Sequence, residues 1–291
     1  ANPPCVTSKR RFCRWNGIDS AAAATRRECL VQLIDSHCHL TFDGLHGRID
    51  DVIRRAHDAG VTHFITIATD AADALRALAL SQKHPCVYVA AGIHPHEAGK
   101  VAAGWDDALL QNARRNDIYA VGETGLDYHY DFADKNAQLA VFRRQLEIAC
   151  QVNKPVVIHC REAHQDTMSA LADFKGLPGC VFHCFTGDEN EAGQILERGY
   201  WLSLTGVVTF KRSDELRRVA KMIPDDRLMV ETDAPYLSPE PVRNIRPNEP
   251  ANMPHTARCI AEQRRMDIEE LAPLSVRNTR RFFSLPANEL A

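Results

Sequence analysis

Eight short runs of β-branched and apolar residues recur along the chain from Leu33 onward, and stretches with helical spacing separate them. This alternation constrains the fold more than any other feature, because each run predicts a strand and each spacer a helix. The predicted strands cover residues 33–38, 63–68, 87–93, 118–122, 155–159, 180–184, 200–204 and 228–231. Two further helices are expected near residues 254–265 and 267–283. Eight such units in one domain are typical of a (β/α)8 TIM-type barrel of the α/β class.

A doubly wound open sheet is the rival fold for alternating strands and helices. It usually has fewer strands, and it commonly binds nucleotides through a glycine-rich turn after a strand. The sequence contains neither G-x-G-x-x-G nor G-x-x-x-x-G-K. The barrel is therefore the preferred prediction.

The first 32 residues differ in composition from the rest of the chain. They lack sustained periodicity, and residues 1–30 carry six Lys/Arg against two Asp/Glu. We therefore expect a basic flexible extension over residues 1–32 and a single catalytic barrel over residues 33–291. The remainder is mildly acidic, because the whole chain has a formal net charge of -3 although residues 1–30 have an excess of basic residues. This balance argues against a protein that coats polyanions, although a local basic patch could still bind nucleic acid.

Ten cysteines are scattered along the chain without a C-x-x-C pair, and several lie inside predicted strands. Such a distribution is typical of reduced, buried thiols and not of a disulfide framework. The sequence also has no apolar run that approaches the length of a transmembrane helix. We therefore expect a cytoplasmic protein with no membrane partner and no obligate protein partner.

Side chains that can bind metals stand at the ends of the predicted strands. The first strand ends with Asp35, His37 and His39, whose alternate spacing places them on one face. Two histidines at this spacing are a weak signal alone, since most such pairs are ordinary surface or core residues. Active sites of (β/α)8 barrels lie at the carboxyl ends of the strands, so any partners must come from the same rim. The fourth, fifth, sixth and eighth strands end with Glu123, His159, His183 and Asp233.

Six predicted ligands are too many for one tetrahedral ion. They are His37, His39, Glu123, His159, His183 and Asp233. The set suits two divalent ions, for which nitrogen and oxygen ligands without thiolate favour Mg²⁺, Mn²⁺ or Zn²⁺. We expect Glu123 to bridge the two ions, because a carboxylate has two oxygens. The other ligands are expected to divide into His37, His39 and Asp233 for one ion, and His159 and His183 for the other.

Water held between two such ions would lose a proton near neutral pH and become the nucleophile. Asp233 could orient this water or take its proton, so Asp233 and the bridging Glu123 are the predicted catalytic residues. Asp35 and Glu231 are expected to orient the ligand imidazoles. Three cysteines adjoin the ligands in sequence, and strand alternation predicts that they pack between barrel and helices. They are Cys38, Cys160 and Cys184.

Four residues near the same rim are candidates for substrate binding. His94 ends the third strand and could contact a phosphate or support a ligand. Arg161 shares the face of His159 and could clamp a phosphate oxygen or pair with a carboxylate of the barrel. Arg243 and Arg246 lie in the loop after the eighth strand, where a polyanion would pass.

The residues at this rim lie in motifs that resemble the TatD-like metal-dependent deoxyribonuclease family of the amidohydrolase superfamily. The matching segments are L-I-D-S-H-C-H-L at 33–40, G-I-H-P-H at 92–96, V-G-E-T-G-L-D-Y at 121–128, P-V-V-I-H-C-R-E-A at 155–163, H-C-F-T-G at 183–187 and L-M-V-E-T-D-A-P-Y-L at 228–237. The resemblance implies a (β/α)8 barrel, a divalent-metal site on the six residues above, and hydrolysis of phosphodiester bonds in DNA. It also implies a 3'-5' exonuclease on single strands and supports Glu123 as the bridge.

Three functions follow as hypotheses. The first is a two-metal deoxyribonuclease whose substrate is single-stranded DNA or DNA 3' ends. The second is a metal-dependent ester or amide hydrolase on the same site, such as a D-aminoacyl-tRNA deacylase or a lactonase, because one metal site can serve several chemistries. The third is a non-catalytic nucleic-acid scaffold, which is disfavoured because a binding module has no need of six intact ligands.

Overall fold

The computed structural model describes residues 31–286 of the 291-residue chain. Residues 1–30, which make up nearly all of the expected basic extension, lie outside the described residues, as do residues 287–291. The expected division into an extension and a single catalytic domain therefore stays a prediction. All that follows concerns the described part.

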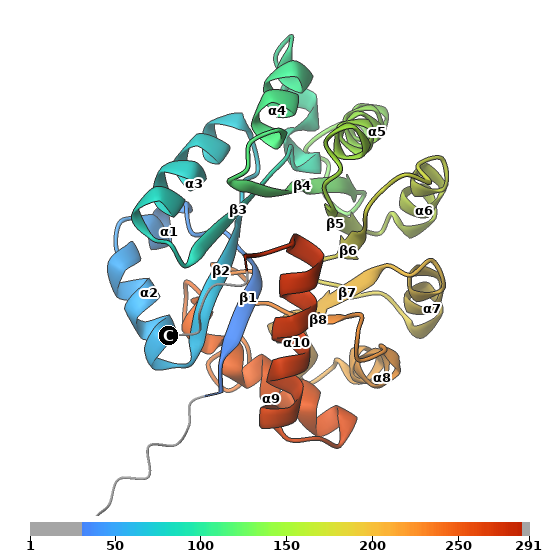
Figure 1. Ribbon diagram of the computed structural model, residues 1–291. Helices are drawn as coiled ribbons and strands as arrows, with labels where there is room; N and C mark the ends of the chain where they lie inside the picture. The colour runs from blue at the N-terminus through green and yellow to red at the C-terminus, as the bar shows by residue number, and fades with distance from the viewer. Residues whose placement is uncertain (1–30, 287–291) are drawn as a thin grey trace, which may run out of the picture. The chain divides into compact units, whose positions relative to one another are not determined.

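Eight parallel strands pair in sequential order and curve into a barrel (Figure 1). They are β1 (Leu33–Cys38), β2 (Val61–Ile67), β3 (Val87–Ala91), β4 (Ile118–Asp127), β5 (Val156–Arg161), β6 (Cys180–Phe182), β7 (Trp201–Leu204) and β8 (Leu228–Val230). The predicted (β/α)8 fold is confirmed. The largest difference is β4, which continues five residues beyond its predicted end at residue 122.

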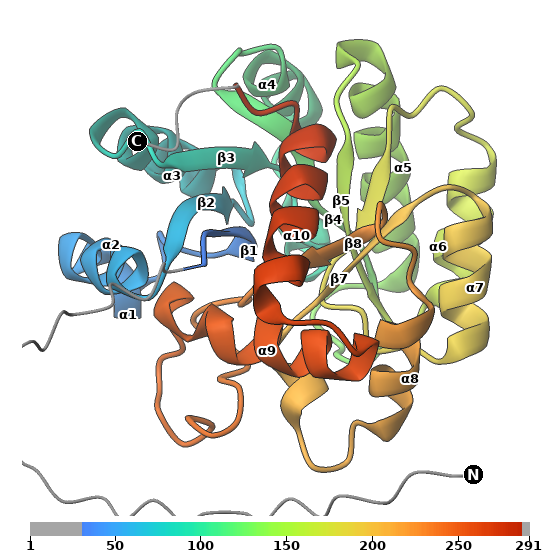
Figure 2. The same cartoon turned by 60° about the horizontal axis from the view of Figure 1, so that its bottom comes forward.

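Helices surround the strands on the outside of the barrel (Figures 1 and 2). The α-helices are α1 (Asp43–His46), α2 (Ile49–Asp58), α3 (Ala71–Lys83), α4 (Trp105–Ala113), α5 (Lys135–Val152), α6 (His164–Ala172), α7 (Glu189–Glu197), α8 (Asp214–Met222), α9 (Met253–Arg264) and α10 (Ile268–Phe283). Three short 3-10 helices are η1 (Pro95–Lys100), η2 (Gly206–Thr209) and η3 (Pro250–Asn252). Aspartates begin several helices by accepting backbone N–H groups that have no partner within the helix, as Asp70, Asp134 and Asp188 do at α3, α5 and α7.

The barrel closes where β1 and β8 approach each other. Within the described residues an isolated bridge joins Cys38 of β1 to Ala234, which lies just after β8, and α10 packs against both strands (Figure 2). Ser275 of α10 accepts a hydrogen bond from the backbone N–H of Val230 at 3.2 Å, and Asn278 donates one to the carbonyl of Leu228 at 2.8 Å. Side chains of the last helix thus satisfy backbone groups that an edge strand would otherwise leave unpaired.

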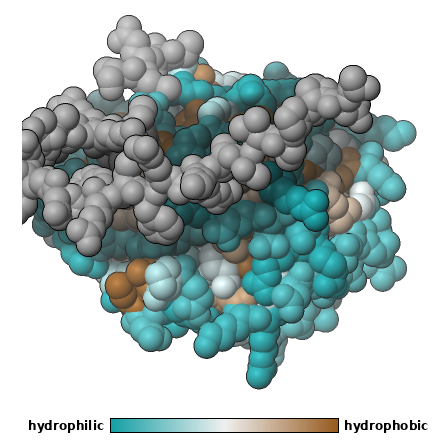
Figure 3. Space-filling model, turned by 90° about the horizontal axis from the view of Figure 1, so that it is seen from below, coloured by the Kyte–Doolittle hydropathy of each residue, from teal (hydrophilic) through white to brown (hydrophobic). Residues whose placement is uncertain are grey.

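The apolar core forms two layers. An inner cluster fills the barrel with residues such as Ile65, Val157 and Met229, while an outer cluster lies between strands and helices and includes Phe64 and Phe142. On the face drawn in Figure 3, the described residues are mainly hydrophilic, and hydrophobic side chains form small separate groups. Among residues 31–286, no helix combines the length and the apolar character that crossing a bilayer requires. The seven described cysteines are all free thiols.

Two glycines let β4 run very close to β5. Gly122 and Gly125 have φ values of +148° and +139°, which L side chains rarely adopt. A Cβ atom at position 125 would lie 1.9 Å from the carbonyl oxygen of His159, and one at position 122 would lie 2.6 Å from that of Val157. Side chains at these positions would force apart the two strands that carry Glu123 and His159.

We expect Gly125→Ala to lower the free energy of unfolding by about 3 kcal/mol or more, because steric overlap adds to an unfavourable φ. Urea denaturation measures this change. Gly193→Ala is the matched control, since a Cβ there meets nothing within 4 Å and alanine favours the interior of α7. Equal stability of Gly125→Ala and the wild type would contradict the conclusion that β4 and β5 lie too close together to admit a side chain at position 125.

Candidate metal centre

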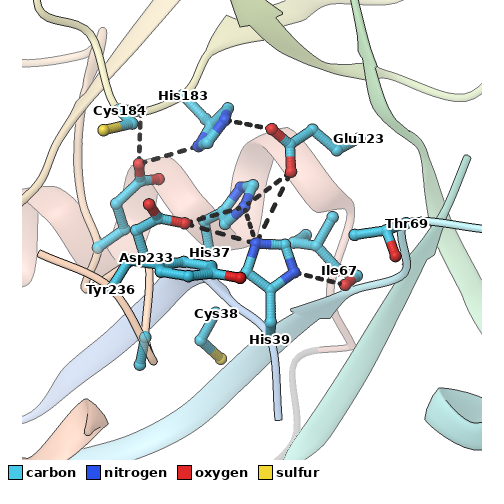
Figure 4. Close-up of polar contacts among 12 residues, drawn as sticks. His37, Cys38, His39, Ile67, Thr69, Glu123, His183, Cys184, Asp233 and Tyr236 are labelled. Carbon is cyan, nitrogen blue, oxygen red and sulfur yellow. Dashed lines mark hydrogen bonds and ion pairs between the residues drawn. The ribbon is translucent and has the colours of Figure 1, made fainter. Parts of the chain in front are cut away.

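The site lies in a cavity of about 930 Å³ at the carboxyl ends of the strands. Five of the six predicted ligands line this cavity, and the sixth, His37, is fully buried at its floor beside them. Figure 4 shows the side chains of His37, His39, Glu123, His183 and Asp233 pointing toward one another. Residues separated by almost 200 positions in sequence are therefore neighbours in space.

Strand alternation explains how β5 and β6 deliver their ligands. On β5 and β6, Val157 and Val181 belong to the inner core, and two residues later His159 and His183 reach the cavity on the same face. On these two strands the inner core and the ligands thus lie on one continuous face. Asp233 is delivered differently, because β8 ends at Val230 and Asp233 has a φ of +54°.

β1 and β4 do not follow this simple rule. Counting by twos from the inner residues Ile34 and Ala120 would turn Ser36 and Gly122 toward the barrel axis, and not His37 or Glu123. The pairing of β1 with β2 shifts register between Asp35 and Cys38, and that of β4 with β5 shifts between Val121 and Thr124. These irregularities re-aim the side chains at the two positions where the site needs them.

The carboxylate of Glu123 stands at the centre of the cluster. Its Oε2 atom lies 3.4 Å from His37 Nε2 and 3.8 Å from His39 Nε2. Its Oε1 atom lies 2.6 Å from His183 Nε2 and 2.8 Å from His159 Nδ1. His94 Nε2 also lies 3.5 Å from Oε1, so each oxygen faces a separate set of imidazoles.

Asp233 lies on the Oε2 side of this cluster. Its Oδ1 atom is 3.4 Å from His39 Nε2 and 3.7 Å from His37 Nε2. The backbone N–H of Asp233 donates to the carbonyl of His37 at 3.0 Å, and the N–H of His39 donates to the carbonyl of Ala234 at 2.7 Å. Closure of the barrel between β1 and the segment after β8 thus builds this half of the site.

Hydrogen bonds fix the ring nitrogens that face the cavity. Nδ1 of His39 donates to the carbonyl of Ile67 at 3.0 Å, so Nε2 is the atom that points inward (Figure 4). Nε2 of His159 donates to the Asp127 carboxylate at 2.9 Å, so Nδ1 points inward. A neutral ring would then aim a lone pair at the carboxylates, and this arrangement is favourable only with a cation or proton between them.

The pKa values follow from this crowding. Burial alone would raise the pKa of Glu123, but the imidazoles of His183 and His94 hold it well below its usual range. Burial would lower the pKa of His39, but the Asp233 carboxylate outweighs it and raises the pKa to about 8. Glu123 similarly overcomes burial and raises the pKa of His183 well above its usual range. A divalent cation that binds here takes the place of these protons.

Three groups of donor atoms are close enough to hold a metal ion, with all atoms of each group within 4.8 Å of one another. They are His37 with His39 and Glu123, His37 with His183 and Asp233, and His94 with Glu123 and His159. Mixed imidazole and carboxylate donors fit a divalent cation. The grouping differs from the predicted division in two ways. His94 joins Glu123 and His159, and His183 groups with His37 and Asp233 and not with His159.

Residues 34–284 match the family described as TatD related DNase. The chain belongs to this family. It is 37% identical over 241 residues to the 3'-5' ssDNA/RNA exonuclease TatD of Shigella flexneri, which covers 81% of this chain and 93% of that protein. It is also 35% identical to the uncharacterized metal-dependent hydrolase YabD of Bacillus subtilis, over 87% of this chain and 99% of YabD. Among solved structures, the TatD homologue YJJV of Escherichia coli superposes with a TM-score of 0.84 at 31% identity, over 88% of this chain and 100% of that one.

In this TatD family member, the two acidic residues expected to orient ligand imidazoles behave differently. Glu231 lies 3.5 Å from Nδ1 of His183, and its carboxylate also accepts hydrogen bonds from the Cys184 N–H and the Ser203 hydroxyl, both at 2.6 Å. Asp35 instead accepts hydrogen bonds from the backbone N–H and hydroxyl of Thr232. Asp35 also accepts the backbone N–H of His37 at 3.4 Å, so it contacts the main chain of a predicted ligand and not an imidazole.

The cysteine prediction was correct for Cys38 but incomplete for the other two. Cys38 is fully buried in the outer core, whereas Cys160 and Cys184 line the cavity. β6 ends at Phe182 and Cys184 has a φ of +45°, so strand alternation no longer governs where its thiol points. Cys160 packs against the outer core and reaches the edge of the cavity.

The structure separates the four candidate substrate residues. His94 lines the cavity, with Nε2 3.5 Å from Glu123 Oε1, and burial lowers its pKa to about 4, so it is neutral at pH 7. Arg161 also lines the cavity. Arg243 stacks on the ring of Phe210 at 3.4 Å, and Arg246 is exposed; neither is among the described residues that line the cavity. Substrate contact by all four stays a prediction.

The sequence analysis assigned no role to Asp127 or His96. One carboxylate oxygen of Asp127 accepts hydrogen bonds from His159 Nε2 at 2.9 Å and from His96 Nε2 at 3.0 Å. The other accepts the backbone N–H groups of His129 and Tyr130, both at 3.0 Å. The signal was available in the motif that follows Glu123, because the continuation of β4 carries Asp127 to the same rim.

Proposed function

We propose that this protein removes nucleotides from the 3' end of single-stranded DNA and uses two divalent cations to do so. As a member of the TatD related DNase family, the chain is a metal-dependent deoxyribonuclease. The number of ions, the strand preference and the direction of cleavage are our proposal. They are supported by the donor groups of the cavity and by the name of the Shigella relative.

The observation that carries the two-ion proposal is the orientation of Glu123. Its two oxygens face different sets of imidazoles, with Oε2 toward His37 and His39 and Oε1 toward His159 and His183. A carboxylate in this position can join two cations while leaving each with further protein ligands. Such a pair of cations would polarise a phosphodiester and lower the pKa of a bound water, so that hydroxide would be available as the nucleophile near neutral pH.

The protein supplies position and proton transfer. Asp233 sits at the cavity wall with its Oδ1 on the side of His39, where it can accept a hydrogen bond from the attacking water and take its proton. Neutral His94 and the guanidinium of Arg161 border the opposite side, where they can bind phosphate oxygens. The cavity is large enough to hold one or two nucleotides around the reacting phosphate.

The alternative of an ester or amide hydrolase is not favoured. The family description and the name of the exonuclease relative both concern nucleic acids. A non-catalytic scaffold is also disfavoured, because five of the six predicted ligands line one cavity and the sixth, His37, is buried beside them.

The proposed direction and strand preference can be tested with blocked substrates. We expect a single-stranded oligonucleotide to be shortened, phosphorothioate linkages at its 3' end to stop the reaction, and the same linkages at its 5' end to have little effect. A blunt duplex of the same sequence should react more slowly. A block by 5' linkages alone, or equal rates on the duplex, would contradict the proposal.

We expect Asp127→Asn to weaken metal binding about 10- to 100-fold, the usual cost of losing a partner that orients a ligand histidine. The amide cannot accept hydrogen bonds from both His159 and His96 while also accepting those of the backbone. Titration with Mn²⁺, followed by electron paramagnetic resonance, measures the affinity without relying on activity.

Asp166→Asn is the matched control for this change, because Asp166 accepts a hydrogen bond from Tyr128 and does not line the cavity. Its Mn²⁺ affinity should equal that of the wild type. Wild-type affinity in Asp127→Asn as well would show that Asp127 does not orient the inward nitrogen of His159.

A further inference from the structure

Four large aromatic side chains are exposed in the described part of the chain, and all four gather at the mouth of the metal cavity. They are Phe42, Tyr130, Phe132 and Tyr236, with exposed fractions between 43% and 59%. Three of them line the cavity, and Phe132 contacts one of the three. The large exposed hydrophobic residues elsewhere in residues 31–286 are aliphatic.

The first pair, Phe42 and Tyr236, stands on the His39 side of the site. Phe42 follows β1 and Tyr236 follows β8, and their ring centroids are 5.9 Å apart. The Tyr236 ring lies 6.2 Å from that of His39 and extends beside it (Figure 4). This pair therefore adjoins the half of the centre built by His37, His39 and Asp233.

The second pair, Tyr130 and Phe132, stands on the His159 side. Both residues follow β4, and their ring centroids are 5.3 Å apart. The ring centroids of Phe132 and His96 are 4.7 Å apart, and the Asp127 carboxylate accepts hydrogen bonds from both His96 and His159. The guanidinium of Arg161 lies 4.9 Å from the centre of the Tyr130 ring. This side thus combines aromatic faces with a cation.

Packing within the protein does not account for these rings. A tyrosine or phenylalanine that stabilises the fold is mostly buried, as Phe64 and Phe142 are here, because the hydrophobic effect scales with the area removed from water. The four rings leave about half of their surface in solvent, beside a site whose substrate carries flat bases. Stacking of unpaired bases on aromatic side chains is a common means of binding single strands.

We propose that the two aromatic pairs are base-binding subsites on opposite sides of the scissile phosphodiester. This inference rests on the proposed function and adds the part of the substrate that is recognised. One pair stacks the base of the leaving nucleotide, and the other stacks the base of the nucleotide that precedes it. Arg161 binds a phosphate beside the second pair. Bases paired in a duplex are stacked on their neighbours, so the subsites select unpaired ends.

The test combines ring-removing variants with oligonucleotides that lack one base. The variants are Tyr236→Leu and Tyr130→Leu, which keep an apolar side chain, and the abasic residue is placed at the last or the next-to-last position. On the intact oligonucleotide, we expect each variant to lose about tenfold to a hundredfold in kcat/KM, mainly through KM. Each variant should have the same kcat/KM as the wild type on the abasic oligonucleotide that lacks the base stacked by the removed ring.

Met222→Ala is the control, because Met222 is an exposed hydrophobic residue of α8 away from the cavity; it should react as the wild type does. If the wild type degrades the oligonucleotides and both tyrosine variants match it, the subsites are refuted while the nuclease stands. The subsites are also refuted if the variants lose equally on intact and abasic substrates. A wild type that cleaves no oligonucleotide under any metal condition overturns the proposed function and this inference together.

Discussion

Asp233→Asn is expected to lower kcat by about 10³-fold or more, because the proposed general base and a charged ligand of the proposed metal centre would be lost together. Asp233 has a φ of +54°, a conformation that asparagine also tolerates, so the substitution preserves the backbone. The amide has the same shape as the carboxylate but cannot take a proton from water. Steady-state hydrolysis of a single-stranded oligonucleotide at saturating metal measures the loss.

Asp58→Asn controls for the removal of a negative charge, since Asp58 is an exposed residue of α2. It should retain wild-type kcat. Substantial activity in Asp233→Asn with unchanged metal content would show that another group accepts the proton.

Glu123→Gln is expected to have an effect at least as large. Glu123 is the residue whose oxygens face both sets of imidazoles, and it is almost completely buried. The amide carries no charge, and its NH2 group would replace one of the two oxygens that face ring nitrogens. We expect the bound metal to fall from two ions per chain to one or none, and kcat to fall by about 10³-fold or more.

Metal content after gel filtration, measured by mass spectrometry, tests this result independently of activity. Glu189→Gln is the matched control, because Glu189 is an exposed residue that pairs with Arg218 far from the cavity. Two ions retained by Glu123→Gln would refute the bridging role.

Much of the site could be predicted from the sequence because its geometry is local to each strand end. A run such as V-V-I-H shows both that β5 is a strand and that His159 ends it, and the barrel topology then places all strand ends at one rim. The strands were found within a few residues of their observed bounds for the same reason. Apolar periodicity reports burial directly.

What could not be predicted depends on how neighbouring strands align. The register shifts that turn His37 and Glu123 into the cavity arise from pairing with β2 and β5, and no pattern within β1 or β4 specifies them. The partner of Asp35 is Thr232, a residue nearly two hundred positions away. Such contacts become visible only once the barrel has closed.

The aromatic pairs lie in loops, and their contacts could not be predicted from the sequence either. Phe42 and Tyr236 come from segments at the two ends of the barrel sequence, and nothing in the spacing of either segment indicates that their rings meet. The stacking of Arg243 on Phe210 was likewise not indicated by the sequence, and its substrate contact stays a prediction. Loop residues follow the three-dimensional path of the chain and not a periodic rule.

The most direct test is a time course of a 5'-labelled single-stranded oligonucleotide with the purified protein in Mg²⁺, Mn²⁺, Zn²⁺ or EDTA, beside the His183→Ala variant. His183 is the imidazole that lies nearest to Glu123, so its loss should disrupt the metal centre while the strand that carries it stays in place. We predict a ladder that shortens from the 3' end with at least one of the metals, and intact DNA in EDTA and in the variant. A full rate in EDTA, or an equal rate with His183→Ala, would contradict a metal-dependent nuclease built on these six residues.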